Sequence, residues 1–194
     1  MTSESWIDLQ RHPSTRTDAV RAIQVAVRRS SAELNLTFRF DGDIPRIRFA
    51  PPTTPRFARD LWQHTCFEAF IAINGQDGQA GQAAAYHEFN FAPSGEWTVY
   101  AFSGYRNGSP VADEKLQPNI AIRSTANRLE LDAVVPLDRL SAIHARALLR
   151  IGLSAVVETS DGLSYWALSH PKDKPDFHNA DGFTLSLEPP GPEE

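Results

Sequence analysis

Apolar residues recur at every second position over most of the chain, and this period of two predicts β-strands. The alternation is clearest at residues 23–30 and 32–43, where apolar side chains would line one face and polar side chains the other. Polar turn sequences separate these segments into about ten short strands. Only residues 136–147, with a proline at the start and leucines at helical spacing, predict a helix. The pattern therefore predicts an all-β fold, an antiparallel β-sandwich with one short helix.

One predicted strand carries an acidic residue where an apolar one would be expected. The segment 61–73, LWQHTCFEAFIAI, is apolar on both faces yet contains Glu68. Such a strand is either covered on both sides or has one face lining a pocket. Because a buried ionised carboxylate without partners costs several kcal/mol, Glu68 needs hydrogen-bond donors. An internal arginine would make it a structural residue, whereas the hydroxyl groups of a ligand would make it a functional one.

Other polar side chains could join Glu68 if the strands that carry them are its neighbours. Glu88 and Asn90 share one face of the strand predicted at residues 86–91, and Arg106 follows the next strand. Carboxylates, amides and guanidinium groups beside aromatic rings suit sugars, whose edges need directional hydrogen bonds and whose C–H faces are apolar. These residues therefore form a candidate sugar-binding set.

Two tryptophans are candidates for the aromatic platform of such a site. Trp62 precedes Glu68 by six residues, and Trp166 lies in a later strand just before His170, which would border the same pocket. Taken singly, each tryptophan is favoured as a residue that fills the core or its rim. The hypothesis is that Trp62 stacks on the ligand and that Trp166 provides a second surface.

Composition and charge limit the possible partners. The chain has 194 residues, which suits one domain, and a net charge of −5 with scattered arginines. Nucleic acid and membrane are therefore not expected partners. Cys66 is the single cysteine, which excludes an intrachain disulfide, and no signal peptide is recognisable, so a cytoplasmic location is expected. We expect one domain over residues 1–188 and a disordered tail at 189–194; the oligomeric state stays open.

Three segments together resemble a known family. They are LWQHTCFEAFIAI at 61–73, YHEFNFAPSGEWTVYAFSGYR at 86–106 and GLSYWALSHPKDKPDFHNADGF at 162–183. Over roughly residues 23–187 the chain resembles the bacterial DOMON-like domain proteins, which are similar to family 9 carbohydrate-binding modules. The resemblance implies a β-sandwich of jelly-roll type that binds sugars or haem.

The resemblance also implies roles for individual residues. In family 9 modules, a tryptophan that stacks on the sugar is followed six residues later by a glutamate that accepts from its hydroxyl groups, and Trp62 and Glu68 match this spacing. Asn90 and Trp166 correspond only loosely to a later asparagine and a second tryptophan. Residues 64–66, HTC, replace the acidic pair of many modules, so neither a calcium site nor the same sugar specificity is implied.

Haem and metal binding are alternatives that the histidines leave open. Haem-binding DOMON domains use a methionine ligand, and the single methionine here is Met1, so a haem would need histidines such as His87 and His170. In the polar stretch SHPKDKPDFHNADGF, His170, Asp176 and His178 could bind a metal, but their spacing matches no standard signature. The stretch could instead be a loop held by its own ion pairs, or a lid with His170 or Lys172 on the ligand. We expect no cofactor and no metal.

Catalysis is a further alternative. Glu68 and Glu88 would satisfy a glycosidase if their carboxyl groups lay about 5–10 Å apart. No phosphate-binding glycine loop and no nucleophile elbow is present in the sequence. The sequence thus favours a non-catalytic module for a small carbohydrate or related polyhydroxylated ligand over a haem or redox accessory domain, a small glycoside-acting enzyme or a protein-interaction module.

Overall fold

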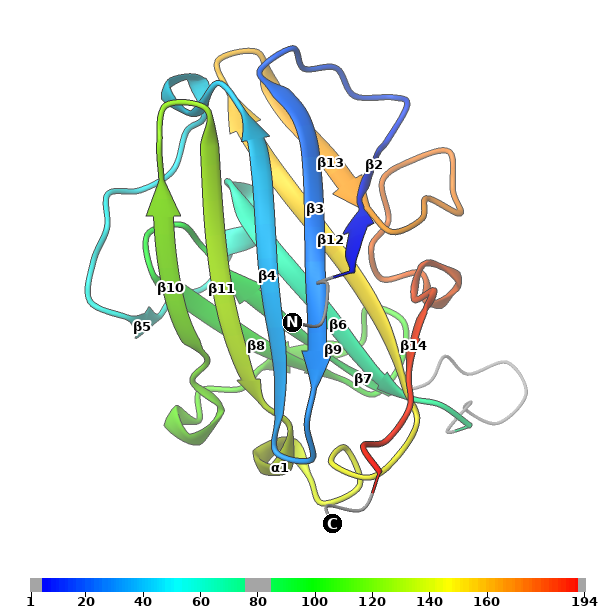
Figure 1. Cartoon of the computed structure of the whole chain (residues 1–194). Helices are drawn as coiled ribbons and strands as arrows, with labels where there is room; N and C mark the ends of the chain where they lie inside the picture. Colours follow the sequence, from blue (N-terminus) through cyan, green and yellow to red (C-terminus); the bar gives the residue numbers. More distant parts are fainter. Residues whose placement is uncertain (1–4, 76–84, 192–194) are drawn as a thin grey trace.

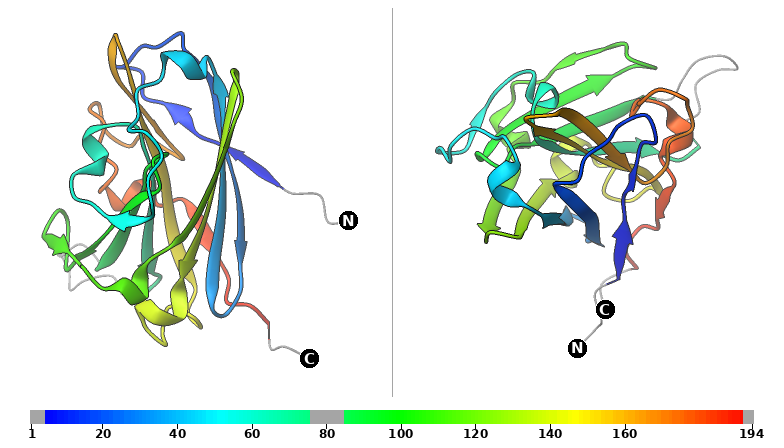
Figure 2. Two further views of the ribbon diagram at one scale, coloured as in Figure 1. Left: turned by 90° about the vertical axis from the view of Figure 1, so that its left-hand side faces the viewer. Right: turned by 90° about the horizontal axis from the view of Figure 1, so that it is seen from above.

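The computed structural model describes residues 5–75 and 85–191, and they form two β-sheets packed face to face (Figures 1 and 2). We call the first sheet A and the second sheet B. The strands of sheet A, in spatial order, are β1 (Trp6–Asp8), β3 (Val20–Arg29), β4 (Glu33–Gly42), β11 (Arg128–Pro136) and β10 (Asn119–Ser124). All neighbouring pairs in this sheet are antiparallel.

Sheet B contains the strand of Glu68 at its centre. Its strands, in spatial order, are β2 (Gln10–Arg11), β13 (Gly162–Ala167), β12 (Leu149–Thr159), β6 (Cys66–Ile73), β7 (Tyr86–Phe91), β8 (Glu96–Phe102) and β5 (Arg56–Phe57). Two short strands extend it, β14 (Leu185–Leu187) on β12 and β9 (Gly108–Pro110) on β8. The β5–β8 pair is parallel and the other pairs are antiparallel.

The core lies between the two sheets, as the period of two requires. Sheet A contributes alternate residues such as Phe38 of β4, and sheet B contributes Phe67 of β6 and Phe91 of β7. The ring of Phe38 lies 5.0 Å from that of Phe67 and 6.4 Å from that of Phe91. The predicted all-β sandwich is confirmed.

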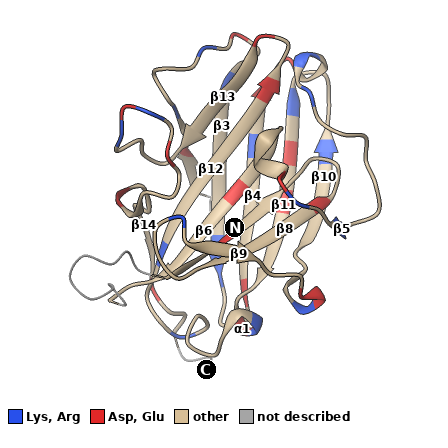
Figure 3. Cartoon of the chain, turned by 180° about the vertical axis from the view of Figure 1, so that it is seen from behind, with Lys and Arg blue, Asp and Glu red and all other residues tan. Residues whose placement is uncertain are grey.

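The outer face of sheet B is also largely apolar, which explains why β6 is apolar on both sides. Phe70 and Tyr86 form a second cluster there with Phe183, which belongs to the segment after β13. Gly152 of β12 allows this close packing, because a Cβ at that position would lie 2.6 Å from the Phe183 ring. Among Asp, Glu, Lys and Arg, β6 contains only Glu68 and β7 only Glu88 (Figure 3).

The predicted helix is much shorter than expected. Within residues 136–147 only α1 (Leu137–Leu140) is α-helical; Pro136 ends β11, and turns follow at residues 142–146. Ser141 ends the helix in an extended conformation, and its hydroxyl group accepts from the backbone N–H of His144 and contacts the His144 ring.

Short 3-10 helices are η1 (Ile44–Arg46), η2 (Leu61–Gln63), η3 (Glu114–Leu116) and η4 (Ala180–Gly182). No helix in the described part of the chain is long and apolar enough to cross a membrane. Residues 192–194 of the predicted tail lie outside the described residues.

Candidate ligand pocket

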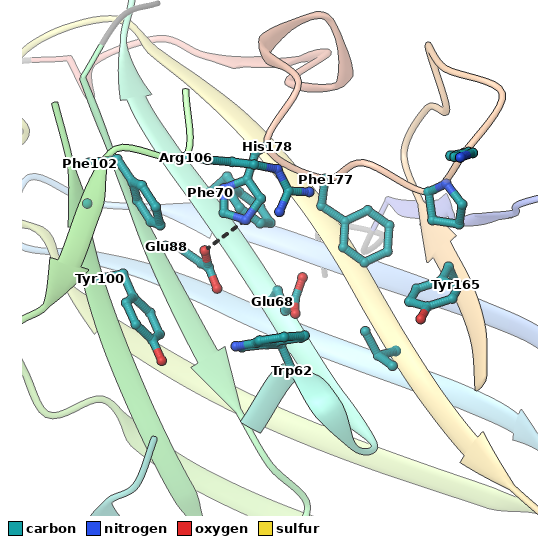
Figure 4. Close-up of a pocket in the computed structure, with 14 residues that line it drawn as sticks. Trp62, Glu68, Phe70, Glu88, Tyr100, Phe102, Arg106, Tyr165, Phe177 and His178 are labelled. Atoms are coloured by element: carbon teal, nitrogen blue, oxygen red, sulfur yellow. Dashed lines mark ion pairs between the residues drawn. The ribbon is translucent and has the colours of Figure 1, made fainter. Parts of the chain in front are cut away.

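A pocket of about 580 Å³ opens on the outer face of sheet B (Figure 4). Strands of sheet B, the helix η2, the turn after β8 and the loop at residues 174–178 contribute to it. Its lining residues are Trp62, Glu68, Phe70, Glu88, Tyr100, Phe102, Arg106, Gly108, Val156, Tyr165, Lys174, Pro175, Phe177 and His178. The pocket is thus an aromatic-walled hollow with two acids on its floor.

The two glutamates are brought together by the pairing of β6 with β7. Glu68 lies opposite Asn90 and Glu88 lies opposite Phe70, so the two acids are diagonal neighbours on one face. Glu68 is 2% exposed and Glu88 is 4% exposed. The adjacency on which the sugar-site hypothesis depended is therefore present.

Each carboxylate accepts one hydrogen bond from a neighbouring side chain. Ser154 of β12 donates its hydroxyl to Glu68 Oε2 at 2.7 Å. Asn90 donates its amide to Glu88 Oε1 at 2.6 Å, and the Asn90 carbonyl accepts from the thiol of Cys66 at 3.4 Å. These contacts fix the orientation of both carboxyl groups while leaving Glu68 Oε1 and Glu88 Oε2 without a hydrogen bond from the described residues.

Burial strongly affects the charge of this floor. Desolvation and, to a lesser degree, the nearby Glu88 raise the pKa of Glu68 to about 8. The hydrogen bond from Ser154 opposes this rise. Desolvation also raises the pKa of Glu88 to about 7, although the Asn90 hydrogen bond and the charge of Arg106 oppose the rise. Within the described ranges no arginine or lysine forms an ion pair with either acid. The internal-arginine interpretation of Glu68 therefore has no support in its contacts.

His178 closes one side of the pocket as a neutral ring. Its Nδ1 lies 2.8 Å from the hydroxyl of Tyr86, and its Nε2 lies 3.8 Å from Glu88 Oε2 (dashed in Figure 4). Burial, followed by the charge of Arg106, lowers the pKa of His178 to about 4. At neutral pH the imidazole is uncharged, so its contact with Glu88 is not an ion pair under those conditions.

The walls are aromatic and the mouth is marked by Trp62. The Trp62 side chain in η2 is 48% exposed, in contrast to most large apolar side chains of the molecule. Asp60, with a φ of 59°, starts η2 from the left-handed region, and its backbone N–H donates to the Tyr100 hydroxyl at 3.4 Å. This contact ties the platform segment to β8. Phe102 and Phe177 face the cavity from other sides (Figure 4).

Arg106 connects the turn after β8 with the loop that covers the pocket. Its guanidinium lies 3.1 Å from Asp176 Oδ1 and donates to the hydroxyl of Tyr105 at 3.3 Å. Its backbone N–H donates to the Tyr86 hydroxyl at 3.3 Å. A φ of 54° shows that this residue holds a left-handed conformation. Arg106 thus positions the covering loop, and its side chain also lines the pocket.

The structure brings together four of the seven predicted site residues. Trp62, Glu68, Glu88 and Arg106 line the pocket. Asn90 lies directly behind them, fully buried, where it orients Glu88.

Two predicted positions lie elsewhere, which corrects the sequence-based arrangement. Trp166 is 6% exposed within the core between the sheets, and its indole N–H donates to Ser164. Since side chains alternate along a strand, its neighbour Tyr165 faces the pocket instead. His170 does not line the pocket and places its Nε2 2.7 Å from the Gln10 carbonyl.

The remaining pocket residues were not singled out from the sequence. Phe70, Tyr100 and Phe102 had a usable signal, because each lies on the same strand face as an acid or its neighbour. Phe177 and His178 had only the lid interpretation of their stretch as a signal, since they reach the pocket through the path of a loop. The lid interpretation of this loop fits its position, although His170 and Lys172 do not line the pocket.

The histidine-based alternatives are not supported by proximity. In the described ranges, no three His, Cys, Asp or Glu residues are grouped so as to hold a metal ion. Asp176 binds Arg106 and His178 contacts Tyr86, away from His170. His87 lies on the opposite face of β7 from Glu88, with its ring 5.2 Å from that of His144.

Comparison with known proteins identifies the fold. No protein-family model matches the chain, and neither does any curated protein. A candidate carbohydrate-binding protein from Bacteroides uniformis ATCC 8492 matches with a TM-score of 0.64 and 13% identity, over 92% of this chain and 84% of the other. At 13% identity this likeness shows a shared fold and nothing further.

Two further solved structures are family 9 carbohydrate-binding modules from Caldicellulosiruptor kristjanssonii. The complex with glucose has a TM-score of 0.48 and 12% identity, over 85% of this chain and 74% of that one. The complex with cellotriose has a TM-score of 0.46 and 11% identity, over 85% and 72%. Membership in the DOMON-like family stays a prediction.

Proposed function

We propose that the pocket binds a small carbohydrate or a related polyhydroxylated molecule without converting it. One observation carries this proposal: a half-exposed indole, Trp62, lies at the mouth of a cavity whose floor holds two buried carboxyl groups with free oxygens. An apolar ring face beside directional polar groups complements the two kinds of surface that a sugar presents.

Size and fold support the same proposal. The volume of about 580 Å³ falls within the range of about 300–1,000 Å³ that accommodates small-molecule ligands. The pocket is formed mainly by strands and so is largely preformed, which limits the entropy lost on binding. A fold shared with a candidate carbohydrate-binding protein is compatible with this function, but the proposal depends on the pocket itself.

A thermal-shift screen against monosaccharides, disaccharides and haemin tests the proposal. A sugar that binds the folded chain raises the melting temperature in a concentration-dependent way. Isothermal titration calorimetry of each positive sugar then gives the dissociation constant. Stabilisation by haemin with a Soret band, and by none of the sugars, would instead establish the haem alternative.

Trp62→Ala is the decisive variant for the stacking role, and Trp6→Ala is its matched control. Trp6 lies in β1 of sheet A, under the guanidinium of Arg39 at 3.7 Å, remote from the pocket-lining set. We expect Trp62→Ala to weaken sugar binding by about tenfold or more, equivalent to about 1.4 kcal/mol. Trp6→Ala should leave the dissociation constant unchanged. Equal affinities of both variants and the wild type would remove Trp62 from the site.

A second candidate function is glycoside cleavage, and the paired glutamates are the observation in its favour. Glu68 and Glu88 lie together on the floor of a ligand-sized cavity, and raised pKa values are typical of general acids. Incubation with a panel of aryl glycosides and detection of the released phenol distinguishes this function. Product release that Glu68→Gln and Glu88→Gln abolish would replace the binding proposal.

A further inference from the structure

Each of the two floor glutamates has one carboxyl oxygen to which no described residue donates a hydrogen bond. Ser154 donates to Glu68 Oε2 and Asn90 donates to Glu88 Oε1, so the bound oxygens already act as acceptors. The other oxygens, Glu68 Oε1 and Glu88 Oε2, belong to residues that line the cavity (Figure 4). Any proton that the pair retains therefore belongs on an oxygen that a ligand can reach.

Among the described residues no lysine or arginine forms an ion pair with either acid. Arg106, whose charge opposes the rise in the pKa of Glu88 without cancelling it, is engaged with Asp176 and Tyr105, and His178 is neutral at ordinary pH. Two buried carboxylates that are diagonal neighbours repel each other, and one of them avoids the repulsion by staying protonated. The titratable or charged groups around the pair come from β6, β7, β8, β13, the turn after β8 and the covering loop, whereas β12 places the uncharged Ser154 and Val156 there. These groups are Cys66, Tyr86, Tyr100, Tyr165, Arg106, Lys174 and His178, and Asp176 lies behind Arg106 as its ion-pair partner.

We propose that Glu68 and Glu88 hold at least one proton between them at neutral pH, so that one of the oxygens Glu68 Oε1 and Glu88 Oε2 donates while the other accepts, and that this dyad selects an uncharged hydroxyl group. A hydroxyl accepts and donates at once, so it satisfies both oxygens. An ammonium group only donates and a carboxylate only accepts, so either ligand group leaves one of the two glutamate oxygens without a hydrogen-bond partner. The ligand half of this inference rests on the proposed function, whereas the proton does not.

The proton is tested directly by nuclear magnetic resonance. The side-chain carboxyl carbons of a ¹³C-glutamate-labelled protein are followed from pH 4 to pH 10, and Glu68→Gln and Glu88→Gln identify the two signals. We expect both to titrate above pH 6, and Glu68 to titrate at lower pH in Glu88→Gln because the repulsion from Glu88 is removed. Glu130→Gln of sheet A is the control and should leave both curves unchanged. Titration of both wild-type signals near the ordinary value of about 4.3 overturns the proposal.

Hydroxyl selection is tested with glucose as the probe. Glucose binding by the wild type should weaken by about tenfold or more between pH 6 and pH 9, as the dyad loses its donor. In Glu68→Gln the amide carbonyl can still accept from Ser154 while the amide NH₂ donates towards the cavity at every pH. This variant should therefore change affinity less than about twofold over the same range.

The outcomes separate this inference from the proposed function. Glucose binding that is constant from pH 6 to pH 9 in the wild type overturns hydroxyl selection while sugar binding stands. Absence of glucose binding at both pH values, in a protein that binds none of the screened sugars, overturns hydroxyl selection and the proposed function together. The carboxyl titration still decides whether the glutamates share the proton in that case.

Discussion

A mid-strand glutamate on the outer face of sheet A has ion pairs with arginines, whereas one on the outer face of sheet B has none among the described residues. On sheet A, Glu130 of β11 contacts the guanidinium of Arg39 at 3.0 Å and that of Arg123 at 3.4 Å. On sheet B, Glu88 of β7 has no ion pair with a lysine or arginine among the described residues, and its neighbours are the Asn90 amide and the neutral His178 ring. The first arrangement is an ordinary hydrated surface. The second retains acids under apolar cover without the pairing that a purely structural role would provide.

Insertion of a lysine into each outer face is the most severe test of this contrast. Ala72 of β6 is 5% exposed beside the Phe70 cluster, whereas Ala121 of β10 is exposed and lies opposite Asp132. Ala72→Lys should lower the free energy of unfolding by roughly 3 kcal/mol or more, because an unpaired ammonium would be buried. Ala121→Lys should change it by less than about 0.5 kcal/mol. Urea unfolding followed by tryptophan fluorescence measures both, and similar losses would mean that sheet B is as well hydrated as sheet A.

Neutralising one glutamate on each sheet should have effects of opposite sign at pH 9. Burial raises the pKa of Glu88 to about 7, so the folded wild type loses stability as the pH rises through that value. The glutamine amide has no charge to bury, and Glu88→Gln should be more stable than the wild type by about 1–3 kcal/mol at pH 9 and gain nothing at pH 4. Glu130→Gln should cost at most about 1 kcal/mol at pH 6 and at pH 9. Melting curves at the three pH values decide the signs, and a destabilised Glu88→Gln at pH 9 would show that this carboxylate is ionised and satisfied.

The sequence predicted what depends on alternation along a strand. A period of two placed Glu68 and Phe70 on one face and predicted the sandwich. The same rule could not decide which face of the strand at Trp166 turns outward. Trp166 shares one face with Ser164, and Tyr165 lies on the other. Either face could have formed the core side or the pocket side. Burial of the largest side chain between the sheets decided it in favour of Tyr165 for the pocket.

What the sequence could not predict depends on pairing and on loop paths. The meeting of Glu68 with Glu88 follows from the register of β6 on β7, and no local pattern specifies that register. His178 reaches Glu88 because Arg106 and Asp176 connect two segments about seventy residues apart. Such contacts arise from tertiary packing. The sequence therefore reveals which residue types are present and does not reveal which of them lie close together.

The smallest expected effect is a difference in glucose binding between variants of two arginines that form similar ion pairs. Arg106 pairs with Asp176 beside the pocket, and Arg128 pairs with Asp41 at 2.7 Å on sheet A. Replacement of either by alanine should cost only about 0.2–1 kcal/mol of stability, because both arginine side chains are about half exposed and water screens their ion pairs. The left-handed backbone at Arg106 suits alanine no worse than arginine, since both have a Cβ.

Binding should separate the two variants although stability does not. Arg106→Ala removes one of the two side-chain contacts that hold Asp176 to the turn after β8 and leaves the hydrogen bond from the Tyr105 hydroxyl at 2.9 Å, so part of the order of the covering loop must be gained when a sugar binds. We expect roughly threefold weaker glucose binding, or about 0.6 kcal/mol, and no change for Arg128→Ala. Calorimetric titrations of both variants at pH 6 measure the difference. Equal glucose affinities would mean that the loop at residues 174–178 keeps its place without Arg106, and that the ion pair belongs with those of sheet A.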